Sequence, residues 1–313
     1  MTLTRLSVLT LGPPILVGAV YALSFPSSKP DYGPRTARAA AGAVARTAVR
    51  GENDDPLERA CRMAADEILP QLPPSCRAIV RAPFVLAGDL PDAELDRLHR
   101  EAVLPVTAAL WRSFFDRKPD GPVTIVALGS EAAYRAAAVK LDGYEPLAYA
   151  GYTQRGRRRI VLNLATGRGT LAHELAHVLA AFDFPGMPEW FDEGLAALHE
   201  EAVFSRDGLT MSGRSNWRSR LLADALRKTD APTLESVIAT TTFRGEGEGL
   251  NYAVVRSFCQ YLQHRGLLSH FYRKFRQAAP EDPRGVSTLC ELLGVATLDE
   301  VDRDFRAWAV RDE

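Results

Sequence analysis

The residues of this chain whose types and spacing could do chemistry lie in one stretch, "HELAHVLAAFDFPGMPEWFDEG", residues 173 to 194. His173 and His177 are four positions apart, so on a helix their side chains lie one turn apart on the same face. Two imidazoles placed in this way can bind a single Zn²⁺ through ring nitrogens ~2.0–2.1 Å from the metal. A catalytic zinc also needs a third protein ligand and an open position for water.

Two glutamates of the stretch can supply the groups that are still missing. Glu174 cannot point the same way as both histidines, but it can lie over the edge of the site and take the proton of a metal-bound water. Glu193 lies about one turn inside a second predicted helix, where its carboxylate can point back at the histidines. A solvated surface glutamate is the simpler interpretation of Glu193 in isolation. Its neighbours Trp190 and Phe191 make the helix too apolar for free exposure, and a buried carboxylate requires a partner.

The residues around the histidines predict a helix pair over residues 170 to 201. "DFPGMP" breaks the first helix, and Pro188 suits the first turn of the second. The histidines lie on one side of the first helix, among small alanines that let other elements approach closely. The opposite side carries an apolar stripe that should face the core, namely Leu171, Leu175, Val178, Leu179 and Phe182.

The elements that must position this pair are predicted from apolar periodicity and turn residues. Before the pair, the pattern predicts a sheet and two helices; after it, the pattern is almost wholly helical. We therefore expect an α+β fold with a mixed α/β half over residues 57–169 and a helical half over 170–313, the histidine helix standing at the junction. The predicted strands cover 77–88, 122–128, 149–153 and 158–164, and the predicted helices cover 92–115 and 130–141, the latter capped by Ser130.

"HELAH" followed by "PEWFDEGLAAL" resembles the gluzincin zinc metallopeptidases, in detail the bacterial peptidase MA-like family. The resemblance implies a zincin-like fold, one Zn²⁺ per chain held by His173, His177 and Glu193, and Glu174 as the base. "RRIVLNLATGRGT" is similar to the family's edge strand and turn, and "LDEVDRDFRAWAV" to its closing helix, so the match covers about residues 77 to 310. No "GAMEN"-type segment is present upstream, which makes aminopeptidase action doubtful.

Tyr252 is the candidate for stabilising the oxyanion that forms when water attacks a carbonyl. It lies near the start of a predicted helix after the Gly-rich "GEGEGL", and related peptidases often place a tyrosine hydroxyl there. Alternatively, Tyr252 belongs to an ordinary apolar stripe with Val255, Cys259 and Leu262.

Three further features have both a functional and a structural interpretation. Strand 158–164 could pair with an extended substrate backbone at a sheet edge. The arginines of "RGRRR", residues 155–159, either attract acidic substrates or protect that edge from aggregation. Asp183 either orients a ligand histidine or caps the helix end. The remaining histidines, His99, His199, His264 and His270, lack ligand spacing and are expected to be structural or surface residues.

The N-terminus is the exception to a globular composition. Residues 3–25 carry Arg5 and then no charge until Lys29, which is typical of a secretory signal peptide or an N-terminal membrane anchor. We therefore predict that signal or anchor over residues 1–26 and an Ala- and Arg-rich linker over 27–56. The expected location is extracytoplasmic: periplasmic, secreted or anchored in the membrane.

The net charge limits the classes of partner that the chain is expected to bind. The formal net charge of −1 gives no overall attraction to nucleic acid, and none is expected as a partner.

The cysteines lie in two sequence-local pairs, Cys61 with Cys76 and Cys259 with Cys290, which allow either two local disulfides or four free thiols.

The sequence as a whole predicts an exported zinc metallopeptidase that hydrolyses bonds in a peptide or protein substrate. Two alternatives stay open. One is a non-catalytic, zinc-stabilised binding or scaffold protein of the cell envelope, although a purely structural zinc needs no base such as Glu174. The other is a zinc amidase that acts on a non-protein substrate.

Overall fold

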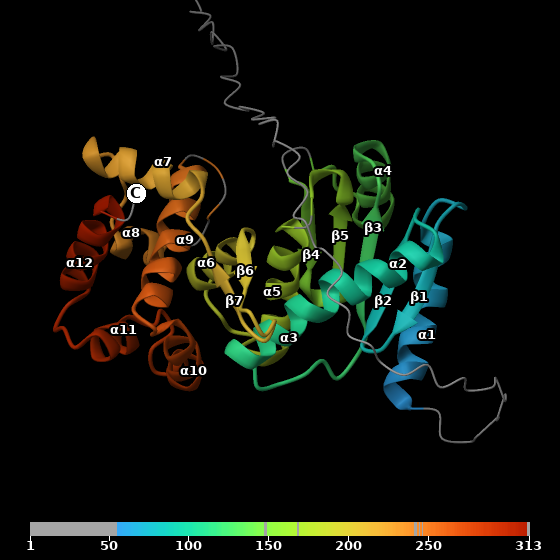
Figure 1. Cartoon of the computed structure of the whole chain (residues 1–313), viewed down its shortest axis with the longest axis horizontal. Coiled ribbons are helices and arrows are strands. Elements are labelled where there is room, and N and C mark those ends of the chain that lie inside the picture. Colours follow the sequence, from blue (N-terminus) through green and yellow to red (C-terminus); the bar gives the residue numbers. More distant parts are fainter. Residues whose placement is uncertain are drawn as a thin grey trace, which may run out of the picture. The chain divides into compact units, whose positions relative to one another are not determined.

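A five-stranded mixed sheet organises the N-terminal half of the fold. A computed structural model describes residues 55–146, 149–167, 169–240, 243, 245 and 247–311, and these residues form an α+β fold (Figure 1). Strands β2, β3 and β5 are parallel, whereas β1 and β4 pair antiparallel at the two edges. In spatial order the strands are β1 (Arg77–Arg81), β2 (Phe84–Gly88), β3 (Val123–Leu128), β5 (Arg159–Asn163) and β4 (Gly151–Gln154).

The predicted signal peptide or anchor, and the predicted linker up to residue 54, lie outside the described residues. Among the helices that are described, none is both long and apolar enough to cross a membrane.

The strand predicted over residues 77–88 is in fact two strands. β1 and β2 form a hairpin in which Arg77 pairs with Gly88 and Arg81 with Phe84. The chain turns at Ala82 and Pro83, where the proline has no N–H to continue the ladder. The composition predicted one continuous strand because both strands are apolar and only two residues separate them.

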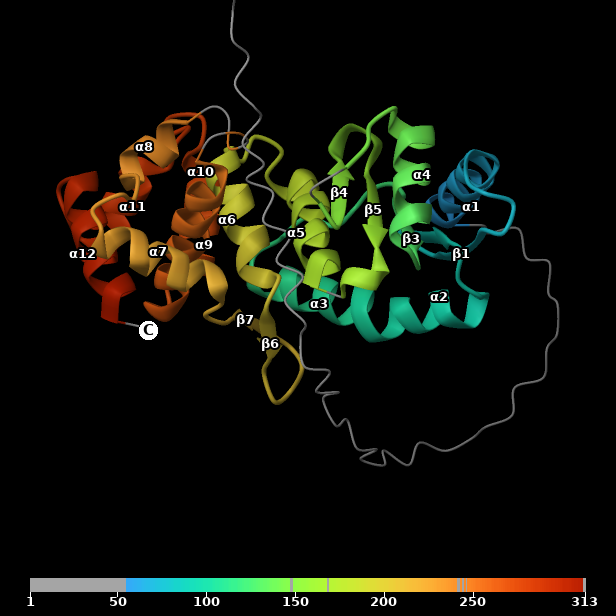
Figure 2. The same cartoon turned by 90° about the horizontal axis from the view of Figure 1, so that it is seen from above.

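Helices cover both faces of the sheet, as Figure 2 shows. On one face, α1 (Pro56–Ile68) packs on Val85, and α4 (Glu131–Asp142) packs on Val126 and Val161. On the other face, α2 (Asp92–Leu98), α3 (Leu104–Ser113) and α5 (Gly169–Asp183) share a core with Ile125 and Ile160.

Two helix predictions can be compared directly with these elements. The Ser130 hydroxyl accepts a hydrogen bond from the Ala133 N–H at 3.2 Å, so it caps α4 as predicted. The helix predicted over 92–115 is interrupted by a π-helical turn, His99–Val103, between α2 and α3. Pro105, in the first turn of α3, has no N–H to donate to the preceding turn, which explains why the regular α-helical pattern changes there.

The C-terminal half is helical except for a hairpin that the sequence pattern did not indicate. Strands β6 (Ala202–Phe204) and β7 (Met211–Gly213) pair antiparallel after the second helix of the predicted pair. Three residues are too few to show an alternating pattern, which is why these strands were missed. The helices of this half are α6 (Glu189–His199), α7 (Trp217–Arg227), α8 (Leu234–Ala239), α9 (Glu248–His264), α10 (Leu268–Ala278), α11 (Val286–Leu293) and α12 (Leu298–Arg311).

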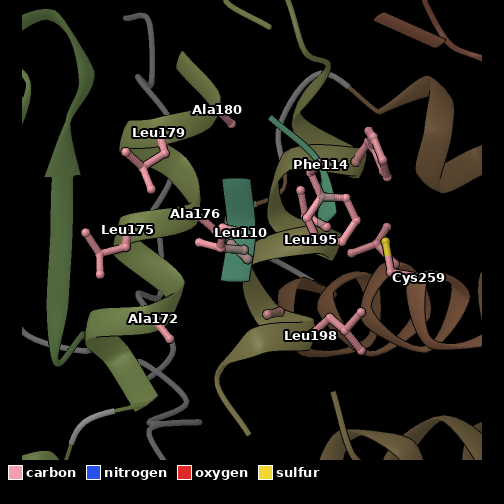
Figure 3. Packing of buried hydrophobic residues seen from close by; sticks show 14 of the residues in the cluster. Leu110, Phe114, Ala172, Leu175, Ala176, Leu179, Ala180, Leu195, Leu198 and Cys259 are labelled. Carbon is pink, nitrogen blue, oxygen red and sulfur yellow. The ribbon is translucent and has the colours of Figure 1, made fainter. Parts of the chain in front are cut away.

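The predicted helix pair, α5 and α6, is packed through small residues. Ala172, Ala176 and Ala180 are buried on the side of α5 that faces α6, whereas Leu175 and Leu179 lie on the side that faces the sheet (Figure 3). The alanines let the two helix backbones approach closely, as their sequence positions suggested. This close approach brings side chains of the two helices within reach of a shared ion.

All four cysteines are free thiols. The alternative of two local disulfides is therefore wrong for this structure. Cys259 is completely buried, and this burial raises the pKa of its thiol, so the thiol is neutral and unreactive at ordinary pH.

Candidate metal centre

Three ligand atoms from α5 and α6 converge on one point. The Nε2 atoms of His173 and His177 lie 3.0 Å apart, and Oε2 of Glu193 lies 3.5 Å from each of them. Around a tetrahedral zinc with bonds of ~2.0–2.1 Å, two ligand atoms are separated by about 3.3 Å. The three atoms therefore form one face of a tetrahedron of the right size, with only small adjustments needed to hold an ion.

The burial and the charge of these three side chains favour a bound cation. In the part of the chain that the structure describes, the buried Oε2 of Glu193 makes no hydrogen bond and has the two Nε2 atoms at 3.5 Å as polar contacts, which is costly for a carboxylate oxygen. Burial acts to raise the pKa of Glu193, but the neighbouring histidines outweigh it and hold that pKa well below its usual range. Burial acts to lower the pKa of His173, but Glu193 and Glu200 outweigh it and raise that pKa. The site thus favours bound positive charge.

No fourth protein ligand accompanies these three. Within the part of the chain that the structure describes, His173, His177 and Glu193 are the whole group of side chains that could share an ion. A structural zinc usually has four protein ligands, whereas a catalytic zinc has three and an open position. The donor set, two imidazoles and one carboxylate, fits zinc and leaves such a position.

His177 is oriented by Asp192, the residue next to the third ligand. Its Nδ1 lies 2.9 Å from Oδ1 of Asp192, and Asp192 forms an ion pair with Arg155. A carboxylate at this point favours a proton on Nδ1, which would leave the Nε2 lone pair free for a metal. The sequence offers a signal for this residue, because Asp192 directly precedes Glu193, whereas Asp183 is the residue that the sequence suggested for the role.

Asp183 lies elsewhere and has a structural role. Its carboxylate accepts hydrogen bonds from the backbone N–H groups of Asp116 and Arg117 at 2.9 and 2.7 Å. It also accepts one from the Tyr272 hydroxyl at 2.9 Å and pairs with Arg276. Asp183 therefore connects the end of α5 to α10 and to the segment after α3, and the idea that it orients a histidine is wrong.

His173 has an equivalent carboxylate partner. Its Nδ1 lies 3.0 Å from Oε1 of Glu200, whose other oxygen accepts a hydrogen bond from Arg218 at 2.5 Å. Burial acts to raise the pKa of Glu200, but His173 and Arg218 outweigh it and lower that pKa. Each histidine thus has a carboxylate behind it, and each carboxylate has an arginine behind it.

Glu174 lies beside the ligands and faces the sheet. Its side chain is buried, and Oε2 accepts a hydrogen bond of 2.6 Å from the hydroxyl of Thr153 on strand β4. Nothing in the sequence marked Thr153, because strand β4 is far from the helix pair along the chain.

Tyr252 is connected to the site through Arg218. The centre of the Tyr252 ring lies 5.8 Å from that of the Phe243 ring. The Arg218 guanidinium lies 5.9 Å from the centre of the Tyr252 ring. The same guanidinium binds Glu200 behind His173. Tyr252, Val255, Cys259 and Leu262 are all buried, as expected if Tyr252 belongs to an apolar stripe.

The strand beside the site is β4, and this corrects the prediction for residues 158–164. β5 pairs with β3 on one side and with β4 on the other, so it lies inside the sheet and has no free edge. Of the four arginines of "RGRRR", residues 155–159, Arg157 is exposed and the other three form ion pairs within the protein. Arg155 pairs with Asp192, Arg158 with Asp120, and the buried Arg159 with Asp142. They neither form a free basic patch nor protect an edge of β5.

Comparison with known proteins adds no relative to this picture. No protein-family model matches the chain, and no curated protein is significantly similar to it.

Proposed function

We propose that this chain is a zinc-dependent metallopeptidase of the gluzincin type. His173, His177 and Glu193 would hold one Zn²⁺ per chain. The observation that carries the proposal is the convergence of their three ligand atoms at 3.0 to 3.5 Å, with a buried carboxylate, Glu174, beside them. Two imidazoles, a carboxylate and a neighbouring general base are the parts from which zinc hydrolases are built.

The protein's own groups have distinct parts in hydrolysis. When bound, Zn²⁺ supplies Lewis acidity that polarises the substrate carbonyl and makes water acidic. Glu174 accepts the proton of the attacking water and delivers it to the amine nitrogen of the leaving product. Asp192 and Glu200 hold the two histidines in one tautomer and orientation. Tyr252 is proposed to donate a hydrogen bond to the oxyanion, acting beside Arg218.

The zincin-like fold belongs to the same proposal. What supports it is the order of elements around the site: an antiparallel edge strand, β4, beside the histidine helix α5, followed by α6 with the third ligand. An extended peptide that adds to β4 would lie next to Glu174. The substrate proposed on this ground is a peptide or protein chain.

Export is proposed from the sequence of residues 3–25, which lies outside the described residues. It places the peptidase outside the cytoplasm, either released or attached to the membrane through this segment.

The test is zinc content and hydrolysis, measured together on residues 27–313. We expect about one zinc per chain by mass spectrometry and turnover of members of a peptide library. His177→Ala should lose both, because it removes a ligand. Glu174→Gln should keep the zinc and lose turnover, because the amide cannot accept a proton.

The exposed His264 offers a matched control. His264→Ala should keep zinc and activity. Absence of zinc in the unmodified protein would refute the metal centre. Zinc with equal turnover in Glu174→Gln would refute the assigned base, and zinc with no hydrolysis of any peptide would favour the scaffold or non-protein amidase alternatives.

A further inference from the structure

Strand β4 and the residue just beyond it face the metal centre with alternate residues. Successive side chains of a strand point to opposite faces, so residues 151 and 153 share one direction, and Arg155 follows in the turn after the strand. At Gly151, a Cβ would lie 2.6 Å from Cγ2 of Thr170, so the glycine lets the strand approach the start of α5. Thr153 donates to Glu174, and Arg155 pairs with Asp192. One short edge segment therefore contacts both the base and the carboxylate that orients His177.

The contact between Thr153 and Glu174 has a defined direction. Oγ1 of Thr153 lies 2.6 Å from Oε2 of Glu174 and 3.3 Å from its backbone oxygen. A hydroxyl has one hydrogen to donate, and the carboxylate oxygen is the acceptor at the shorter distance. Within the described residues, the hydroxyl of Thr153 is the hydrogen-bond partner of this carboxylate, and Oε1 has none.

We infer that Thr153 is the positioning residue of the general base, an inference that rests on the proposed function. By holding Oε2, the hydroxyl would leave Oε1 as the oxygen that accepts the proton of the attacking water. Thr153 does not touch a metal ligand, so it acts on the base and leaves metal affinity unchanged.

A merely structural role would have a different signature. If Thr153 served only to fasten β4 to α5, its loss would lower stability and leave the behaviour of Glu174 intact. Thr153→Val removes the hydroxyl while keeping the shape and a good strand former, so the fold should tolerate it. Thr153→Ser restores the hydroxyl. Thr107, buried in α3 with a hydroxyl that has no partner, provides the matched control Thr107→Val.

The experiment is the binding of acetohydroxamate to the cobalt-substituted full chain, followed by visible absorption. This probe chelates the metal and passes its proton to a neighbouring base, so its affinity reports the base without needing a substrate. Thr153→Val should weaken binding about tenfold, because a hydrogen bond to a charged group is lost. Thr153→Ser should bind within about threefold of the unmodified protein, and Thr107→Val should not differ from it. Cobalt content should be the same in all four.

Glu174→Gln separates failure of the inference from failure of the proposed function. Weak binding to Glu174→Gln with unchanged binding to Thr153→Val would overturn the inference and leave the proposed function standing. No cobalt spectrum in the unmodified protein would overturn both. With a peptide substrate in hand, Thr153→Val should lower kcat about tenfold with little change in KM, and Thr153→Ser should recover most of it.

Discussion

At the residue scale, each histidine of the candidate metal centre contacts a carboxylate, and each of these carboxylates contacts an arginine. His177 lies against Asp192 and Arg155, and His173 against Glu200 and Arg218. Such partners set the tautomer of a ligand histidine, and their loss typically costs 10- to 100-fold in metal affinity. They are therefore the positions at which metal affinity can be altered without touching a ligand.

Asp192→Asn should weaken zinc binding about tenfold, because the amide keeps an oxygen near His177 but removes the charge. The affinity is measured by competition with a chromophoric chelator. Asp183→Asn is the matched control: this carboxylate is also buried, but it binds Tyr272 and Arg276 and has no part in orienting a histidine. It should lower the free energy of unfolding and leave zinc affinity within about twofold. Equal zinc affinities for both variants would refute the role given to Asp192.

His199 makes the protein sensitive to acid. Burial lowers the pKa of this histidine from 6.5 to about 4, an effect that the hydrogen bond of its ring to the Leu195 carbonyl opposes only in part. Between these two values the unfolded chain binds the proton and the folded one does not. The stability due to neutral His199 is therefore fully present above about pH 6.5 and is lost as the pH falls toward about 4, by on the order of 3 kcal/mol.

The test is urea unfolding at pH 7 and pH 4.5 with a chelator present, so that zinc does not contribute. His199→Phe should lose less free energy of unfolding on acidification than the unmodified protein. The same change at the exposed His264 should leave the pH dependence as it was. An identical pH dependence in His199→Phe and the unmodified protein would contradict the assignment.

At the element scale, the distance between helices decides whether the ligands can meet. α6 carries Glu193 and is pressed against α9 at the residue that follows it. A Cβ on Gly194 would lie 2.8 Å from the Val255 carbonyl oxygen and 2.9 Å from Sγ of Cys259. The glycine that follows the ligand in "WFDEG" is thus required by packing, because any side chain there would push α6 off α9.

Gly194→Ala should destabilise the protein by about 1–3 kcal/mol, although alanine is normally the better helix residue, because it overpacks a closed contact. It should also weaken zinc binding, since α6 moves with its ligand. Gly249→Ala in α9 is the opposite case: that glycine is exposed and has only one side-chain atom near the added Cβ. Chemical denaturation should show Gly249→Ala as neutral or more stable by up to about 1 kcal/mol. If both changes stabilised the protein, α6 could move away from α9 without lowering the free energy of unfolding.

At the scale of the whole molecule, the ion would join parts of the chain that are otherwise connected by packing, hydrogen bonds and ion pairs. The ligands come from α5 and α6, and their partners reach to β4 and its end and to α7, which carries Arg218. An ion bound only by the folded chain stabilises the fold by an amount that grows with the logarithm of its free concentration over its dissociation constant. Metal content and global stability should therefore change together.

Removing zinc with a chelator should lower the midpoint of thermal unfolding. Free zinc at about 100 times its dissociation constant should restore about 2.7 kcal/mol of stability. His177→Ala should unfold at the same temperature with and without the chelator, since it has no ion to lose. A chelator that left the unmodified protein unchanged would mean that the centre holds no metal.

The sequence by itself determined the local chemistry. His173, His177 and Glu193 lie together as their spacing predicted, because a helical turn and a short break between two helices are local features. The α+β class and the cap at Ser130 follow from the same local rules. Turn residues were a less reliable guide to where strands begin and end. The two short strands on either side of Pro83 were predicted as one strand, and β6 and β7 were too short to show an alternating pattern.

Only the tertiary structure decided what surrounds that chemistry. That β4 and not β5 is the edge strand depends on strand order, which no periodicity encodes. Thr153 contacts Glu174, and Asp192 takes the role considered for Asp183, because of where distant segments pack. The spacing of apolar residues along a helix or strand shows which of its faces is buried, but it does not show which other element covers that face. The ligands could therefore be found along the chain, whereas the groups that position them could be found only in space.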